Sequence, residues 1–137
     1  MKIGIVTIYN VPNYGAILQA YSLAEYLRRE GHEVVLFNVD SPKRHPYIYK
    51  LKRLFKLGFI DKFQQRNYPA ITSNLNEEVD IYMVGSDQVW NIEITQADYD
   101  KYFLAFALHN RKVSYAASFG NNEWDFPSKR NEIRGFL

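Results

Sequence analysis

The chain has 137 residues, of which 47% are apolar, and its formal net charge at neutral pH is +2. This length suits a single domain, and the apolar content is high enough for a packed core, which argues against an intrinsically disordered chain. The absence of cysteine excludes disulfides, thiolate zinc sites and cysteine nucleophiles, and the apolar runs are far shorter than the roughly 20 residues of a membrane-spanning helix.

The first 40 residues predict a strand, a helix and a second strand. Residues 3–8 are a short, β-branched apolar run typical of a buried strand, and a second strand is predicted over 33–39. Between them a helix is predicted over 14–30, with Asn13 as its N-cap and Gly31 as its stop. The apolar positions of this helix recur at spacings of three and four: Ile17, Ala20, Ala24 and Leu27. A strand–helix–strand opening predicts parallel pairing with a right-handed crossover.

Residues 43–66 carry a local excess of positive charge. They hold eight Lys and Arg residues and one acid, Asp61, whereas the rest of the chain has nine basic and 14 acidic residues. Apolar residues between 47 and 60 fall near helical spacing, and Gly58 is expected to interrupt this helix. Both a solvated helix face and a surface for an anionic partner fit this pattern. We expect at most weak contact of 43–66 with an anionic membrane surface, and no nucleic acid. Because the sequence opens on a strand pattern without a signal-peptide pattern, we expect a cytoplasmic protein, located at the inner membrane face if this segment contacts lipid.

The second half of the chain predicts two more strands and the start of a helix. Strands are predicted over 80–84 and 112–118, and the apolar run over 102–108 fits either a strand or a helix. Residues 127–137 show a helical spacing that the end of the sequence interrupts without a C-cap signal. We therefore expect an α/β fold with a Rossmann-like parallel sheet, in one domain over 1–137 that is truncated at its C-terminus.

The first candidate site lies where the first strand meets the first helix. Ligands of open parallel sheets bind beyond the carboxyl ends of the strands, and the free backbone N–H groups of a helix N-terminus favour anions. Asn13 adds a polar side chain there. The alternative is a capped helix whose Gly15 allows close packing on the sheet. Neither a G-x-G-x-x-G fingerprint nor a Walker A lysine is present, and we expect no cofactor.

The second candidate site follows the third predicted strand, where polar side chains lead to a tryptophan. Asp87 is a candidate general base or acceptor for a sugar hydroxyl, and Gln88 and Asn91 can both donate and accept hydrogen bonds. Trp90 could stack on a sugar ring. The alternative is that Ser86 or Asp87 only caps a short helix and that Trp90 belongs to the core.

The third candidate site is the end of the last predicted strand, where Ala116, Ala117 and Ser118 are small. A helix packing over this strand would account for them, and a ligand near Ser118 and Gly120 is the alternative. The three histidines share no metal-ligand spacing, and we expect no metal site: His32, His45 and His109.

Three stretches of the chain carry a further signal when they are taken together. The first is residues 13–21, Asn-Tyr-Gly-Ala-Ile-Leu-Gln-Ala-Tyr, and the second is residues 85–91, Gly-Ser-Asp-Gln-Val-Trp-Asn. The third is residues 102–104, Tyr-Phe-Leu, followed by residues 114–120, Ser-Tyr-Ala-Ala-Ser-Phe-Gly. In this order, and at predicted strand ends, they resemble the polysaccharide pyruvyl transferase family over nearly the whole chain.

The resemblance implies a two-domain enzyme of the GT-B type, in which two Rossmann-like halves face a cleft. Such enzymes transfer a pyruvyl group from phosphoenolpyruvate to sugar hydroxyls of a cell-surface glycan or its lipid-linked precursor, in exopolysaccharide biosynthesis. The matching part is the N-terminal half of the family. This chain would therefore supply the acceptor side, would be inactive alone, and would leave most phosphoenolpyruvate contacts to the other half.

On this resemblance, Asp87 is the expected catalytic residue, which would orient or deprotonate the acceptor hydroxyl. The expected substrate-binding residues are Asn13, Tyr14, Gly15, Gln19, Ser86, Gln88, Trp90, Asn91 and Ser118. Two other functions stay open. A GT-B-like glycosyltransferase half would bind a nucleotide sugar without binding phosphoenolpyruvate. A non-catalytic basic module would bind vesicles or nucleic acid with a steep salt dependence.

Overall fold

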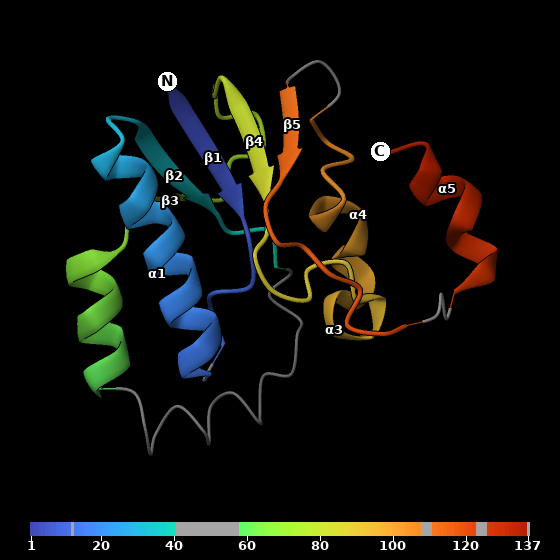
Figure 1. The fold of residues 1–137 in the computed structure, drawn as a ribbon, viewed down its shortest axis with the longest axis horizontal. Helices are drawn as coiled ribbons and strands as arrows, with labels where there is room; N and C mark the ends of the chain where they lie inside the picture. Colours follow the sequence, from blue (N-terminus) through green and yellow to red (C-terminus); the bar gives the residue numbers. More distant parts are fainter. Residues whose placement is uncertain (12, 41–57, 108–110, 123–125, 137) are drawn as a thin grey trace.

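The computed structural model describes residues 1–11, 13–40, 58–107, 111–122 and 126–136. Within them, five strands form one parallel sheet in the order β3-β2-β1-β4-β5 (Figure 1). The strands are β1 (Lys2–Val6), β2 (Glu33–Phe37), β3 (Ala70–Thr72), β4 (Ile81–Val84) and β5 (Arg111–Ser114). This is the strand order of doubly wound, Rossmann-type sheets, and the predicted α/β class with a parallel sheet is confirmed.

The first helix, α1 (Tyr14–Arg29), begins and ends where its capping residues predict. The side-chain oxygen of Asn13 accepts hydrogen bonds from the backbone N–H groups of Gly15 at 2.8 Å and Ala16 at 3.4 Å. At the other end Gly31 has a φ of +83°. Its backbone N–H donates to the Arg28 carbonyl, and the N–H of His32 donates to the Leu27 carbonyl. This pair of bonds is a Schellman motif, which explains why a glycine ends the helix.

The two faces of the sheet bury separate sets of side chains, because alternate residues of a strand point to opposite faces. One face packs against the buried stripe of α1 through Ile3, Ile5, Val34 and Leu36. The opposite face packs against the end of the segment after β4, through Tyr102, Leu104 and Ala107. The buried sheet residues on this face are Val6, Val35, Phe37, Tyr82 and Val84. A Cβ at Gly4 would lie 2.5 Å from the Phe37 ring, so this strand position needs a glycine. Helical segments therefore cover both faces, as a doubly wound sheet requires.

The second half of the chain contains short helices in place of one long crossover. After β4 come α3 (Ile92–Thr95), a 3-10 turn η1 (Gln96–Asp98) and α4 (Tyr99–Tyr102). The predicted strand or helix over 102–108 therefore begins at the end of α4, and residues 103–106 form turns. After β5, residues 127–129 form the 3-10 turn η2 (Pro127–Lys129) and lead into α5 (Arg130–Arg134), so the predicted helix after residue 127 is confirmed.

Several features differ from the sequence expectation or lie outside the described residues. The short strand β3 was not predicted, and β5 ends at Ser114 instead of residue 118. Residues 58–67 are helical, with Gly58 as the first described residue. Most of the predicted basic segment, residues 43–57, lies outside the described residues. None of the helices in the described ranges has the length and apolar character needed to cross a membrane.

Candidate functional site

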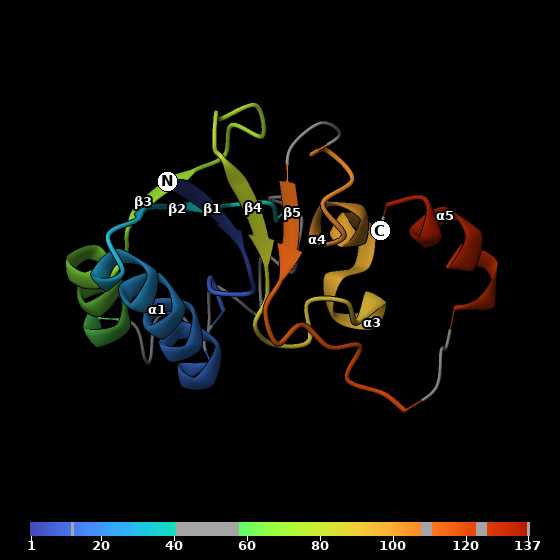
Figure 2. The same ribbon diagram turned by 45° about the horizontal axis from the view of Figure 1, so that its top comes forward.

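The carboxyl ends of β1, β4 and β5 meet at one edge of the sheet, because these strands are neighbours in parallel register. Val6 pairs with Val84, and Val84 pairs with Ser114. The residues after each strand therefore lie side by side, and Figure 2 shows the segment after β5 running beside the loop after β4. This edge brings together residues 85–91 and 115–120, which hold most of the candidate residues.

A hydrogen-bond network joins this edge to helix α1. The Gln19 side-chain amide donates to the Thr7 hydroxyl, the Ile8 carbonyl and the Ala16 carbonyl, each at 3.0 Å. Its side-chain oxygen accepts a 2.6 Å hydrogen bond from the Ser86 hydroxyl, and the Thr7 hydroxyl donates to the Ser86 carbonyl at 3.0 Å. Every polar atom of the Gln19 side chain is therefore engaged within the protein, which makes Gln19 a positioning residue.

Thr7 is a functional candidate that the sequence analysis missed. It is 1% exposed and directly follows the buried strand β1. A polar side chain this deeply buried needs partners, and its partners here are Gln19 and Ser86. The only signal in the sequence is a threonine inside an apolar run, which the strand prediction absorbed because threonine is common in strands.

The loop after β4 holds Asp87 in a backbone conformation that few side chains adopt. Gly85 has a φ of +112° and precedes a cis peptide bond to Ser86, and Asp87 has a φ of +85°. A Cβ on Gly85 would overlap the Tyr115 carbonyl, so this position requires glycine. Left-handed conformations at residues other than glycine occur often at functional sites, which makes Asp87 a candidate on geometry as well as on sequence.

Asp87 presents a carboxylate that is only partly used within the protein. One side-chain oxygen accepts a 2.7 Å hydrogen bond from the Gln88 backbone N–H. The Asp87 carbonyl accepts from the Ser118 N–H at 3.1 Å, in a parallel bridge between Asp87 and Ala117. The second carboxylate oxygen has no hydrogen-bond partner among the described residues. It can therefore accept a further hydrogen bond.

Gln88 and Asn91 form a second polar pair beside Asp87. The Asn91 amide donates to the Gln88 side-chain oxygen at 3.1 Å, and the Asn91 oxygen accepts from the Glu93 N–H at 3.0 Å as the N-cap of α3. A Cβ at Gly120 would overlap the Gln88 carboxamide. The glycine therefore allows the backbone after β5 to lie directly over this pair. Asn91 is 9% exposed and caps α3, whereas the alternative considered from the sequence placed a helix cap at Ser86 or Asp87.

Trp90 packs in an aromatic cluster. Its ring stacks on Phe103 with centroids 5.8 Å apart and 8° between the planes, and it tilts against Phe119 at 5.3 Å. Its backbone N–H donates to the Ser118 carbonyl at 3.1 Å. The indole N–H is buried and has no hydrogen-bond partner among the described residues. The structure thus places Trp90 partly in the core, and its role toward a sugar stays a prediction.

The remaining candidates lie at the N-terminus of α1 and after β5. Asn13, Tyr14 and Gly15 are exposed, and the hydrogen bonds of Asn13 are those of the helix cap. Tyr14 keeps 54% of its surface exposed. Ser118 is exposed and binds Asp87 and Trp90 through its backbone, so its hydroxyl is not needed for the fold.

A further polar pair that the sequence analysis missed lies after β2. The Tyr102 hydroxyl donates a 2.8 Å hydrogen bond to Asp40. Burial raises the pKa of the nearby Tyr9 phenol far above its usual value, and the negative charge of Asp40 raises it further. Tyr9 therefore stays neutral at physiological pH.

The described ranges contain no group of three His, Cys, Asp or Glu side chains that could hold a metal ion.

Comparison with known proteins agrees with the motifs at this edge. The family model described as polysaccharide pyruvyl transferase matches residues 13–134. That range contains every candidate residue from Asn13 to Ser118, and it excludes Thr7. No curated protein and no solved structure matches the chain significantly.

Proposed function

Because the chain belongs to the polysaccharide pyruvyl transferase family, we propose that it supplies the acceptor-binding half of an enzyme that transfers a pyruvyl group from phosphoenolpyruvate. The acceptor would be a pair of sugar hydroxyls on a cell-surface glycan or on its lipid-linked precursor. The second half would be another Rossmann-like domain that faces this one across a cleft, in a GT-B arrangement. Residues 1–137 alone would then be inactive.

The reaction requires a base, and the carboxylate of Asp87 is the observation that carries the proposal. Protonation of the enol carbon of phosphoenolpyruvate produces a centre with oxocarbenium character at the neighbouring carbon. One sugar hydroxyl attacks this carbon and loses its proton, phosphate leaves, and a second hydroxyl attacks, loses its proton and closes the ketal. Asp87 has one oxygen fixed by the Gln88 N–H and the other without a partner among the described residues, so it can accept a hydroxyl proton.

The other candidate residues suit recognition of a sugar. Ser118 and Tyr14 present exposed hydroxyl groups, and Asn13 presents an exposed amide at the N-terminus of α1. Ser86 and Gln19 would hold the Asp87 loop in place through their mutual hydrogen bond. Gln88, Trp90, Asn91 and Gly15 would complete the walls of the acceptor pocket. The cations that phosphate and carboxylate require would come from the other half.

The proposal is tested by assembling the complete enzyme and measuring phosphate release from phosphoenolpyruvate with a glycan acceptor. Release that depends on the acceptor supports pyruvyl transfer. Affinity for a nucleotide sugar, without affinity for phosphoenolpyruvate, would favour a glycosyltransferase instead.

The contact of residues 43–66 with anionic membranes is a separate prediction, tested by vesicle co-sedimentation at low and high salt.

A further inference from the structure

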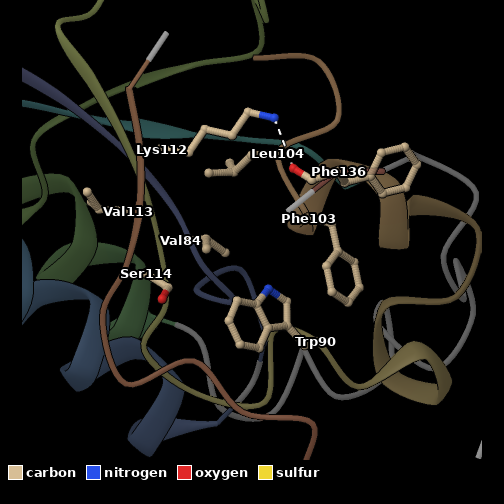
Figure 3. A pocket seen from close by; sticks show the side chains of 8 residues that line it. All are labelled: Val84, Trp90, Phe103, Leu104, Lys112, Val113, Ser114 and Phe136. Carbon is tan, nitrogen blue, oxygen red and sulfur yellow. Dashed lines mark hydrogen bonds between the residues drawn. The ribbon is translucent and has the colours of Figure 1, made fainter. Parts of the chain in front are cut away.

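A cavity of about 130 Å³ lies between the β4–β5 edge of the sheet and the segments around α4 and α5. Figure 3 shows the eight residues that line it: Val84, Trp90, Phe103, Leu104, Lys112, Val113, Ser114 and Phe136. The proposed acceptor pocket uses the loop between Asp87 and Asn91, and apart from Trp90 the cavity is lined by other residues. It is therefore a concave site for which the proposed function has no role.

The indole N–H of Trp90 is the polar group that most needs a partner in this cavity. Its nitrogen is buried and has no hydrogen-bond partner within the described ranges. Figure 3 shows this nitrogen turned toward the space between Val84, Leu104 and Phe103. Buried donors are nearly always paired in folded proteins, and indole can donate but not accept. The cavity therefore calls for an occupant that carries a hydrogen-bond acceptor.

The other polar groups of the lining indicate that this acceptor is anionic. Lys112 crosses the end of the cavity opposite Trp90, and its ammonium donates to the Phe136 carbonyl at 3.2 Å (Figure 3). Within the described ranges this is the one hydrogen bond of that ammonium, and because lysine has three donors, hydrogens remain for a ligand. Ser114 adds an exposed hydroxyl, and the eight lining residues include no Asp or Glu. The eight lining residues therefore combine one cation and two donors with no carboxylate among them.

The volume and the apolar walls limit the size of the occupant. An apolar cavity of about 150 Å³ accommodates a benzene molecule, whereas one water needs only a small part of that volume. Val84, Phe103 and Leu104 would contact hydrocarbon. We propose that this cavity binds a small monocarboxylate of two to four carbons, whose carboxylate accepts from the Trp90 indole and is attracted by Lys112. This proposal does not rest on the proposed function.

Propanoate is a suitable probe, because its neutral isostere propionamide has nearly the same shape. The chain has two tryptophans, so an ¹H–¹⁵N spectrum contains two indole cross-peaks, and Trp90→Phe identifies the one from Trp90. We expect propanoate to move the Trp90 cross-peak downfield in a saturable way, with little movement of the other. No saturable movement would mean that the cavity holds only water, and an equal response to propionamide would mean that the negative charge plays no part in binding. Either result would overturn the proposal.

A pair of lysine variants separates the cavity from general charge effects. Lys112→Met should weaken propanoate binding about three- to fivefold, the size expected for an exposed ion pair. Lys62→Met removes the same charge from an exposed position on the helical residues 58–67, which do not line the cavity, and should leave the dissociation constant unchanged. Equal effects of the two variants would overturn the proposal. If Lys112→Met loses spectral dispersion, Lys112→Gln gives the same comparison.

Discussion

The Ser86 hydroxyl donates a 2.6 Å hydrogen bond to the side-chain oxygen of Gln19, and this bond joins the loop after β4 to the first helix. The two residues are 67 positions apart in the sequence. Thr7 stabilises the same junction from β1, because its hydroxyl binds the Ser86 carbonyl and accepts from the Gln19 amide. The loop that carries Asp87 is therefore fixed by side chains from two other elements.

Thr7→Val tests whether this junction stabilises the fold. Valine keeps the shape of threonine but leaves the Ser86 carbonyl and the Gln19 amide each without one partner. Loss of a buried partner costs about 1–3 kcal/mol, so the free energy of unfolding in urea should fall by this amount. Thr72→Val is the matched control, because Thr72 is partly exposed and its hydroxyl, among the described residues, only accepts from the Asn74 backbone N–H. Equal losses in the two variants would show that the junction adds nothing.

Asp87→Asn tests the catalytic role in the complete enzyme. Asparagine tolerates the left-handed backbone and keeps the oxygen that accepts from the Gln88 N–H, so stability should change little. It cannot accept a proton, so the rate of phosphate release should fall about 10²–10⁴-fold. Glu78→Gln, at an exposed position before the amino end of β4, should keep the full rate. Wild-type turnover of the Asp87 variant would contradict the assignment.

Two glycine substitutions, one in the loop and one as a control, test the geometry of the loop after β4. Gly85→Ala places a methyl group against the Tyr115 carbonyl at a positive φ, and it should cost at least about 2 kcal/mol of unfolding free energy or prevent folding. Gly58→Ala changes an exposed helical residue with no atom near its Cβ position, and it should be neutral or stabilise by up to about 1 kcal/mol. Thermal and urea unfolding measure both. A harmless Gly85→Ala would mean that the loop differs from this geometry.

The N-cap of α1 can be separated from a role in binding. Asn13→Ala should lower the unfolding free energy by about 0.5–2 kcal/mol, because the Gly15 N–H loses its acceptor. Asn13→Asp keeps the cap and should retain stability. If Asn13 contacts the acceptor through its amide N–H groups, Asn13→Asp will still raise the KM for the acceptor in the complete enzyme. Unchanged kinetics in that variant would restrict Asn13 to capping.

The parts of the fold that the sequence predicts are those with local causes. Helix α1 follows from its apolar spacing, the Asn13 cap and the Gly31 stop, all of which act within a few residues. Strand β3 was missed because it has only three residues, of which Ala70 and Ile71 are exposed, and it forms by pairing with β2. Its stability comes from partners distant in sequence, which no local pattern records.

The candidate site also has one part that the sequence predicts and one part that it does not. The position of Asp87 and its neighbours is predictable, because polar residues after a buried strand are expected at the carboxyl edge of a parallel sheet. The partners of those residues are not predictable, since the bonds of Gln19 to Ser86 and of Tyr102 to Asp40 cross more than 60 positions. Thr7 was missed for the same reason, because only the folded sheet brings its partners together.

The buried phenol of Tyr9 predicts how stability depends on alkaline pH. Its pKa is raised in the folded state, first by burial and then by the charge of Asp40, whereas in the unfolded chain it titrates near 10. The contribution of Tyr9 is therefore fully present below pH 10 and is lost as the pH rises above it. Each further pH unit should remove up to about 1.4 kcal/mol per such tyrosine.

Urea unfolding between pH 9 and 11.5 measures this effect, with Tyr9→Phe as the test variant. Tyr68 and Tyr82 also have raised pKa values through burial, so the variant should show a shallower but still negative slope above pH 10. Tyr26→Phe is the control, because Tyr26 is 61% exposed, and it should keep the wild-type slope. If Tyr9→Phe and the wild type lose stability in parallel, the Tyr9 phenol is ionised as easily in the folded protein as in the unfolded chain. The Tyr9 phenol would then not be buried beside the charge of Asp40.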